Sequence, residues 1–66
     1  MRIEVNGEAL ELAGDGTVAA LLVHLGLDHS PAAVEVNRAL VPKREHADRR
    51  LAEGDRVEVV TLVGGG

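Results

Sequence analysis

The chain has 66 residues and no cysteine, so we expect one domain, near the lower size limit for a core without disulfides or metal. Its net charge of −4 and its lack of aromatic residues argue against a nucleic-acid partner, which needs cations for phosphates and rings for bases. Residues 1–7 are not apolar enough for a signal peptide, and no run of about 18 apolar residues can span a membrane. We therefore expect a cytoplasmic protein with no membrane contact.

The first predicted elements are two strands joined by a tight turn. Residues 2–6 and 8–12 both alternate polar and apolar side chains, which is the pattern of half-buried strands. Asn6 and Gly7 both tolerate a positive φ angle, which a two-residue hairpin turn requires. These two segments are therefore expected to be antiparallel neighbours.

One amphipathic helix is predicted after Thr17. The hydroxyl of this residue can accept a hydrogen bond from a first-turn N–H, and Gly26 is suited to end the helix in a left-handed conformation. Between them, four apolar residues with the spacing i, i+3, i+4 and i+7 form one stripe: Val18, Leu21, Leu22 and Leu25.

The rest of the chain is predicted to form further strands. Residues 33–37 and 56–61 alternate polar and apolar side chains, and a short apolar pair at residues 40–41 ends at a proline. Residues 43–50 are polar and charged, and we expect a loop or one irregular turn there.

This order of two strands, one helix and three strands predicts an α+β protein with the β-grasp (ubiquitin-like) fold. The apolar face of a sheet needs one cover, and the single amphipathic helix supplies it. We expect a mixed sheet of four to five strands under one main helix. The prediction is a single domain over residues 1–66 with a flexible glycine tail at residues 62–66.

The glycine tail is the strongest functional signal in the sequence. Residues 64–66 are all glycine, and glycines add nothing to a core and cost entropy to order. A run without Cβ atoms can pass through a narrow channel in an extended form and present an unhindered carboxylate. A carboxylate is a poor electrophile, but adenylation turns it into an activated acyl group. The tail thus predicts a carrier whose partner supplies the chemistry.

At this point the residues resemble the ThiS family, the sulfur carriers of thiamine (thiazole) biosynthesis. The resemblance covers the whole chain, and the family's functional motif, a terminal Gly-Gly, falls on Gly65 and Gly66. It rests on VNGE at residues 5–8, TVAALL at 17–22, AVEVN at 33–37, VP at 41–42, LAEGDRVEVV at 51–60 and the terminal GGG.

The resemblance implies a protein co-substrate and not an enzyme. A ubiquitin-activating-like (E1-like) adenylyltransferase would adenylate the carboxylate of Gly66 with ATP and Mg²⁺, and both belong to that enzyme, so this chain is expected to bind no cofactor. A sulfur donor, usually a persulfide on a partner protein, would then form a thiocarboxylate. Thiazole synthase would take the sulfur into the thiazole ring.

The residues around the tail are candidates for partner binding. Gly64 and Gly65 would follow Gly66 into the partner's channel. Val60 is out of register with the inward residues of the last strand, and with Leu62 and Val63 it would form an exposed apolar patch. Packing of Val60 and Leu62 under the loop at residues 43–50 remains an equal alternative.

Other side chains favour ordinary structural roles. The three histidines lack the spacing of metal ligands, so no metal site is expected, and the glutamates of the strands are expected to form a solvated face of the sheet.

Two other functions of the protein stay open. One is a sulfur carrier for molybdopterin or another sulfur metabolite, and the other is a non-covalent ubiquitin-like binding module in which the tail is incidental.

Overall fold

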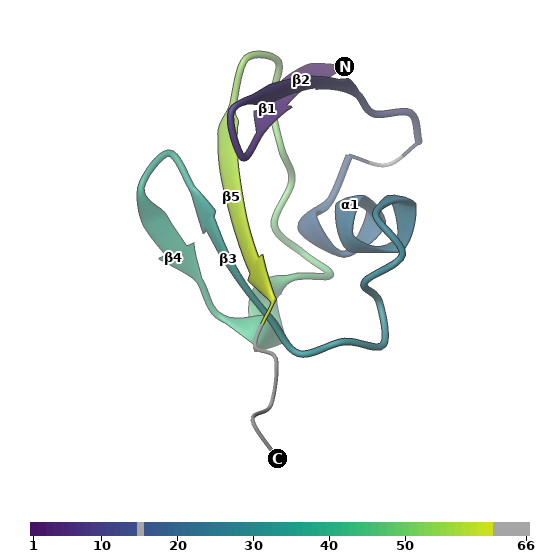
Figure 1. The fold of residues 1–66 in the computed structure, drawn as a ribbon, viewed down its shortest axis with the longest axis vertical. Coiled ribbons are helices and arrows are strands. Elements are labelled where there is room, and N and C mark those ends of the chain that lie inside the picture. Colours follow the sequence, from purple (N-terminus) through teal and green to yellow (C-terminus); the bar gives the residue numbers. More distant parts are fainter. Residues whose placement is uncertain (15, 62–66) are drawn as a thin grey trace.

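The computed structural model describes residues 1–14 and 16–61, and it contains five strands and one α-helix (Figure 1). The predicted order of two strands, one helix and three strands is confirmed. The elements are β1 (Arg2–Val5), β2 (Glu8–Glu11), α1 (Val18–His24), β3 (Ala32–Val36), β4 (Ala39–Val41), the short 3₁₀ helix η1 (Lys43–Glu45) and β5 (Arg56–Thr61).

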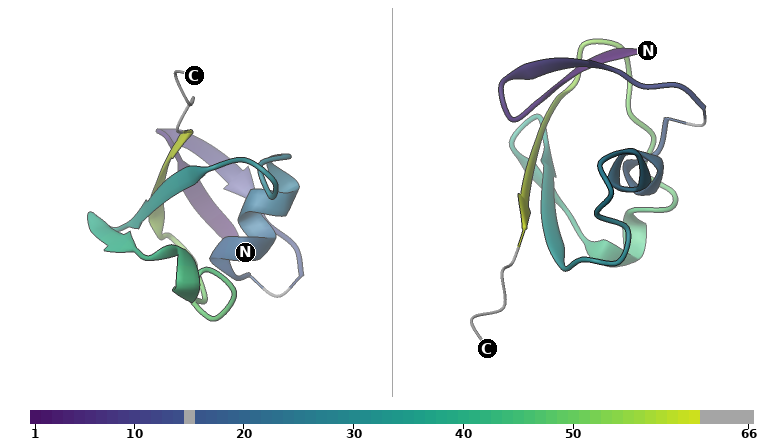
Figure 2. Two further views of the ribbon diagram at one scale, coloured as in Figure 1. Left: turned by 90° about the horizontal axis from the view of Figure 1, so that it is seen from below. Right: turned by 45° about the vertical axis from the view of Figure 1, so that its right-hand side comes forward.

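The five strands form one mixed sheet in the order β2-β1-β5-β3-β4. Strands β1 and β5 are parallel, and every other neighbouring pair is antiparallel. The last strand therefore lies at the centre of the sheet, between the two hairpins. Two further views show α1 on one side of the sheet, as a β-grasp fold requires (Figure 2). The predicted fold class is confirmed.

The core lies between the sheet and α1. Alternate strand residues point inward, and the helix adds one apolar stripe, so that a single cluster forms although the chain is short. The buried apolar residues are Ile3, Val5, Leu12, Val18, Leu21, Leu22, Val34, Val36, Val41, Leu51, Val57 and Val59. The predicted inward faces of β3, β5 and α1 are therefore correct.

Both predicted ends of the helix are confirmed. The side-chain oxygen of Thr17 accepts a hydrogen bond from the backbone N–H of Ala20 at 3.1 Å, which satisfies a first-turn donor. Gly26 follows the helix at a φ angle of 74°, where a residue with a Cβ would be strained.

The segment at residues 43–50 contains more regular structure, and packs more closely on the core, than the sequence indicates. It begins with η1, and its end pairs with the start of the helix segment through an isolated bridge between Thr17 and Arg50. The side chain of His46, read from the sequence as part of a charged loop, is instead buried, with 8% of its surface exposed. Its Nε2 lies 3.0 Å from the carbonyl oxygen of Val41, so it ties η1 to the end of β4.

Candidate functional site at the end of β5

The predicted site lies where the chain leaves the central strand. The described part of the chain ends at Thr61, the last residue of β5, so the candidate residues Leu62, Val63, Gly64, Gly65 and Gly66 lie outside it. The structure therefore defines the base from which these residues continue, together with one candidate side chain, Val60.

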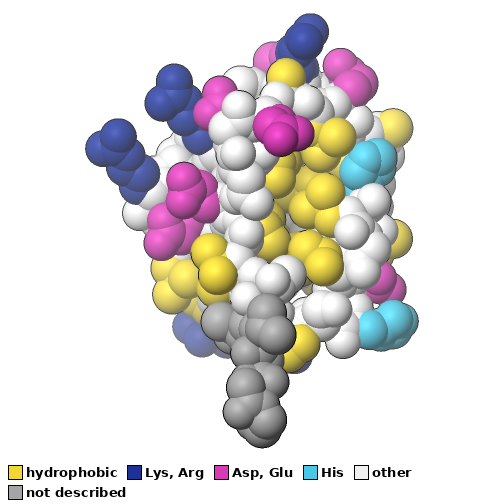
Figure 3. Space-filling model, viewed as in Figure 1, with side chains coloured by type: hydrophobic (Ala, Val, Ile, Leu, Met, Phe, Trp, Pro, Cys, Tyr) yellow, Lys and Arg dark blue, Asp and Glu magenta, His cyan; other side chains and the backbone are white. Residues whose placement is uncertain are grey.

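Val60 lies on the outer face of the sheet, away from the helix, and 57% of its surface is exposed. Of the two possibilities left open by the sequence, the structure shows the exposed side chain and not one packed under residues 43–50. Val60 is opposite Ala33 of β3, and Leu40 of β4, on the same face, is 65% exposed. We call these three residues the outer patch. Hydrophobic side chains are visible along this side of the molecule, over β4 and the end of β5 (Figure 3).

The outer patch is bordered by charged side chains. Glu35 of β3 and Glu58 of β5 lie directly opposite each other on the same face, two pairs further along the two strands from Ala33 and Val60. Beyond them, Glu4 and Arg56 form a loose, exposed ion pair with a nitrogen-to-oxygen distance of 4.0 Å. Like charges that face each other across a sheet are destabilising, whereas an apolar surface beside them is suited to a partner with apolar and cationic groups.

On the other side of β5, a groove of mixed polarity runs between the first hairpin and the end of the helix segment, and its volume is about 430 Å³. Its walls include the apolar residues Leu10, Leu25, Leu27 and Val59 and the polar residues Asn6, Glu8 and Thr61.

The side chain of Asn6 contacts β5 close to the predicted site. Its Nδ2 donates to the carbonyl oxygen of Val59 at 3.1 Å, and its Oδ1 accepts from the N–H of Val59 at 2.9 Å. The sequence identified Asn6 only as a turn residue. The sequence could not predict the contact with Val59, because the two residues are 53 positions apart and no local pattern connects them.

The histidines do not come together. His24 and His29 are exposed, and His46 is buried and bonded to Val41. Within residues 1–14 and 16–61, no three side chains of the metal-binding types lie close enough to hold an ion. In the same part of the chain, no helix is long and apolar enough to cross a bilayer.

The site described above can be compared with known proteins. The model of the ThiS family matches residues 3–66. The chain is 30% identical to the sulfur carrier protein ThiS of Escherichia coli, and the similarity covers the full length of both. It is also 41% identical, over all 66 residues, to part of a thiazole synthase from Paramagnetospirillum magneticum, and it spans one fifth of that protein's length.

A solved structure shows the same fold. The crystal structure of a thiamine biosynthesis protein (ThiS) from Geobacter metallireducens superimposes with a TM-score of 0.80 and 28% identity, and the match covers all of both chains.

Proposed function

Because this chain belongs to the ThiS family, we propose that it is a sulfur carrier of thiamine biosynthesis, with the carboxylate of Gly66 as the group that carries sulfur. One observation supports this proposal above the others: the family match extends through the glycine tail to residue 66. The full-length similarity to the sulfur carrier of Escherichia coli supports it as well.

The proposed chemistry begins with activation of the carboxylate. An oxygen of Gly66 attacks the α-phosphorus of ATP in an E1-like adenylyltransferase, and pyrophosphate leaves. The resulting acyl adenylate is open to nucleophilic attack at its carbonyl carbon. The ATP and Mg²⁺ are bound by that enzyme, and this chain contributes the carboxylate and the reach of its tail.

Sulfur then replaces AMP. The terminal sulfur of a persulfide on a donor protein attacks the carbonyl carbon, AMP leaves, and an acyl disulfide forms. A thiol cleaves the disulfide, which leaves a thiocarboxylate on Gly66 and the donor in a new disulfide. The chain itself has no cysteine, so both thiol groups come from partners.

Thiazole synthase is the proposed acceptor of this sulfur. Support comes from the thiazole synthase of Paramagnetospirillum magneticum, in which one fifth of the length resembles this chain. In that protein a carrier domain and a thiazole synthase would then be joined in one polypeptide, as expected for two proteins that work together. In our proposal Val60, at the base of the tail, contacts the partners with Leu62 and Val63, while Gly64 and Gly65 lie in the active-site channel. The cytoplasm, where ATP is available, is the proposed location.

The test is the intact mass of the chain after incubation with a cognate activating enzyme, ATP, Mg²⁺ and a persulfide donor. We expect the mass to rise by the difference between one sulfur and one oxygen atom. An unchanged mass, with an enzyme set that modifies a known carrier in parallel, contradicts the proposal.

Two alternative functions can be distinguished from the proposed one, the first by genetic rescue and the second by truncation of the tail. A carrier for molybdopterin would rescue a molybdenum-cofactor mutant and not a thiazole auxotroph. A carrier for another sulfur metabolite would instead rescue a mutant that lacks the carrier for that metabolite. A non-covalent binding module would keep its partner after removal of Gly65 and Gly66, whereas a carrier would lose its function and remain folded.

A further inference from the structure

The central strand β5 extends beyond its neighbour β1. The two strands pair in parallel at Glu4 with Arg56 and at Val5 with Val57. At Asn6, with a φ angle of 50°, the chain turns into the hairpin. On its other side, β5 stays paired with β3 as far as Thr61, which lies opposite Ala32. The lower half of β5 therefore runs beside β3 but past the turn of the first hairpin (Figure 1).

The side chain of Asn6 supplies the backbone contact that β1 no longer provides. Its amide group bonds both the N–H and the C=O of Val59, as the backbone of a neighbouring strand would. Val59 is buried and lies two residues before Thr61. Asn6 thus holds β5 on the side opposite β3, just before the chain leaves the sheet.

A second asparagine holds the start of the same strand. Asn37, in the turn between β3 and β4, also has a φ angle of 50°. Its backbone N–H donates to the carbonyl oxygen of Arg56 at 2.7 Å, and its Oδ1 accepts from the N–H of Arg56 at 3.0 Å. The two turn asparagines hold β5 at Arg56, its first residue, and at Val59, near the tail.

We propose that Asn6 is a positioning residue, which fixes the direction in which the chain leaves β5 and so the presentation of the Gly66 carboxylate to the activating enzyme. This inference rests on the proposed function. A strand end held on one side only can pivot, so the tail would start in many directions of which few are productive. Fixing orientation before an encounter lowers the entropic cost of reaching a reactive geometry.

The test compares Asn6→Gly with the matched control Asn37→Gly. Glycine accepts the φ angle of both turns, so each variant keeps its hairpin and loses only side-chain hydrogen bonds. Asn6→Gly loses those to Val59, and Asn37→Gly loses those to Arg56 and to the carboxylate of Asp55. The readout is ATP–pyrophosphate exchange by the cognate activating enzyme, measured against carrier concentration well below both melting temperatures. We expect Asn6→Gly to raise KM by about tenfold, the equivalent of the entropic cost of ordering about one backbone residue on binding, with kcat little changed. Asn37→Gly should leave KM unchanged.

A second variant removes the risk that the glycine turn fails to fold. Asn6→Asp keeps an acceptor for the N–H of Val59 and tolerates the left-handed backbone, but it cannot donate to the carbonyl of Val59. It should raise KM in the same direction. Equal KM values for the Asn6 and Asn37 variants would overturn the inference.

Relaxation of the backbone amides of Val60 and Thr61 by NMR tests the inference without any enzyme. Both amides should lose order in Asn6→Gly and keep it in Asn37→Gly, and unchanged order in Asn6→Gly would overturn the inference. If the wild-type chain is not adenylated at all, the proposed function fails, and this measurement still decides whether Asn6 fixes the end of β5.

Discussion

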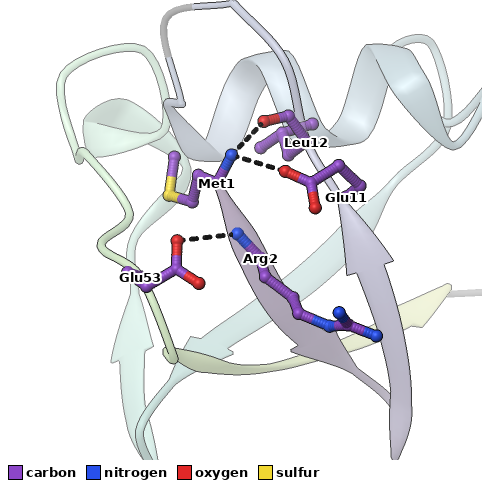
Figure 4. A network of polar contacts seen from close by, with 5 residues as sticks. All are labelled: Met1, Arg2, Glu11, Leu12 and Glu53. Atoms are coloured by element: carbon purple, nitrogen blue, oxygen red, sulfur yellow. Dashed lines mark hydrogen bonds and ion pairs between the residues drawn. The ribbon is translucent and has the colours of Figure 1, made fainter.

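The α-amino group of Met1 lies 2.8 Å from Oε2 of Glu11 and donates a hydrogen bond to it (Figure 4). The same amino group lies 3.1 Å from the carbonyl oxygen of Leu12. One residue further on, the N–H of Arg2 donates to Oε1 of Glu53 at 3.0 Å. These contacts fix the start of β1 against β2 and against the turn before β5.

A dependence of stability on pH follows from this pair. The hydrogen bond to Glu11 raises the pKa of the Met1 amine, and the same bond lowers the pKa of Glu11. The protonated amine therefore stabilises the folded state. This stabilisation is fully present below the ordinary pKa of about 8, and it is lost as the pH rises through the raised pKa of the folded state. The contribution of Glu11 is present above about pH 4.3 and is lost as the pH falls through its lowered pKa.

Thermal unfolding of the wild type and of Glu11→Gln over a pH series checks this expectation. The difference in melting temperature should be small, because both groups are exposed, and largest between about pH 5 and pH 7.5. It should shrink at both ends of the series. A difference that is the same at every pH would show that the ion pair contributes nothing.

His46 provides a second prediction about stability. A carbonyl oxygen only accepts, so Nε2 of the buried ring must carry the proton in its bond to Val41. His46→Ala removes this hydrogen bond to the carbonyl of Val41 and opens a cavity, so it should lower the free energy of unfolding by about 1–3 kcal/mol. The control is His29→Ala, at an exposed position, which should change it by less than about 0.5 kcal/mol. Urea titrations measure both, and equal effects would contradict the role assigned to His46.

Thr17 tests the helix cap. Thr17→Ala removes the oxygen that accepts from the N–H of Ala20, so it should cost about 1 kcal/mol in the free energy of unfolding. Thr17→Ser keeps an oxygen in the same place and should cost clearly less. The prediction is wrong if both variants unfold at the same urea concentration.

The sequence predicted the fold well because its main signals are local. Alternation fixed the inward face of β5, where Val57 and Val59 are buried and Glu58 is exposed. The spacing of apolar residues and the residues at each end defined α1. Each of these signals lies within one element, and the small number of ways to cover one sheet with one helix then selected the topology.

The contacts that the sequence did not predict join distant parts of the chain. The bonds between Asn6 and Val59 and the burial of His46 depend on which segments meet after folding. A local pattern cannot carry that information, and asparagine is common in turns whether or not its side chain makes a distant contact. For the site, the sequence identified Val60 but left open whether it is exposed. That depends on where residues 43–50 pack, and only the folded arrangement decides it.

Gly66→Ala tests the proposed role of the terminal residue. Because the glycines of the tail have no side chain to contribute to the core, the melting temperature should not change. A single added methyl group in a closely fitting channel is worth about 1–3 kcal/mol, so adenylation should slow by about tenfold or more. ATP–pyrophosphate exchange measures the rate, and calorimetry measures the melting temperature. A large fall in melting temperature would mean that the tail packs against the body, contrary to a role in presentation.

Val60 tests the outer patch as part of the partner interface, and the chain offers a matched control. Val60 and Val23 are almost equally exposed, at 57% and 60%, but Val23 lies on α1 and Val60 at the base of the tail. Val60→Ser removes apolar area from the outer patch, and truncation of an interface anchor typically costs more than about 1 kcal/mol of binding. The KM for the carrier should therefore rise by about fivefold or more with the activating enzyme. Val23→Ser should leave it unchanged, so an equal rise in both variants would show a general loss of apolar surface and no interface at Val60.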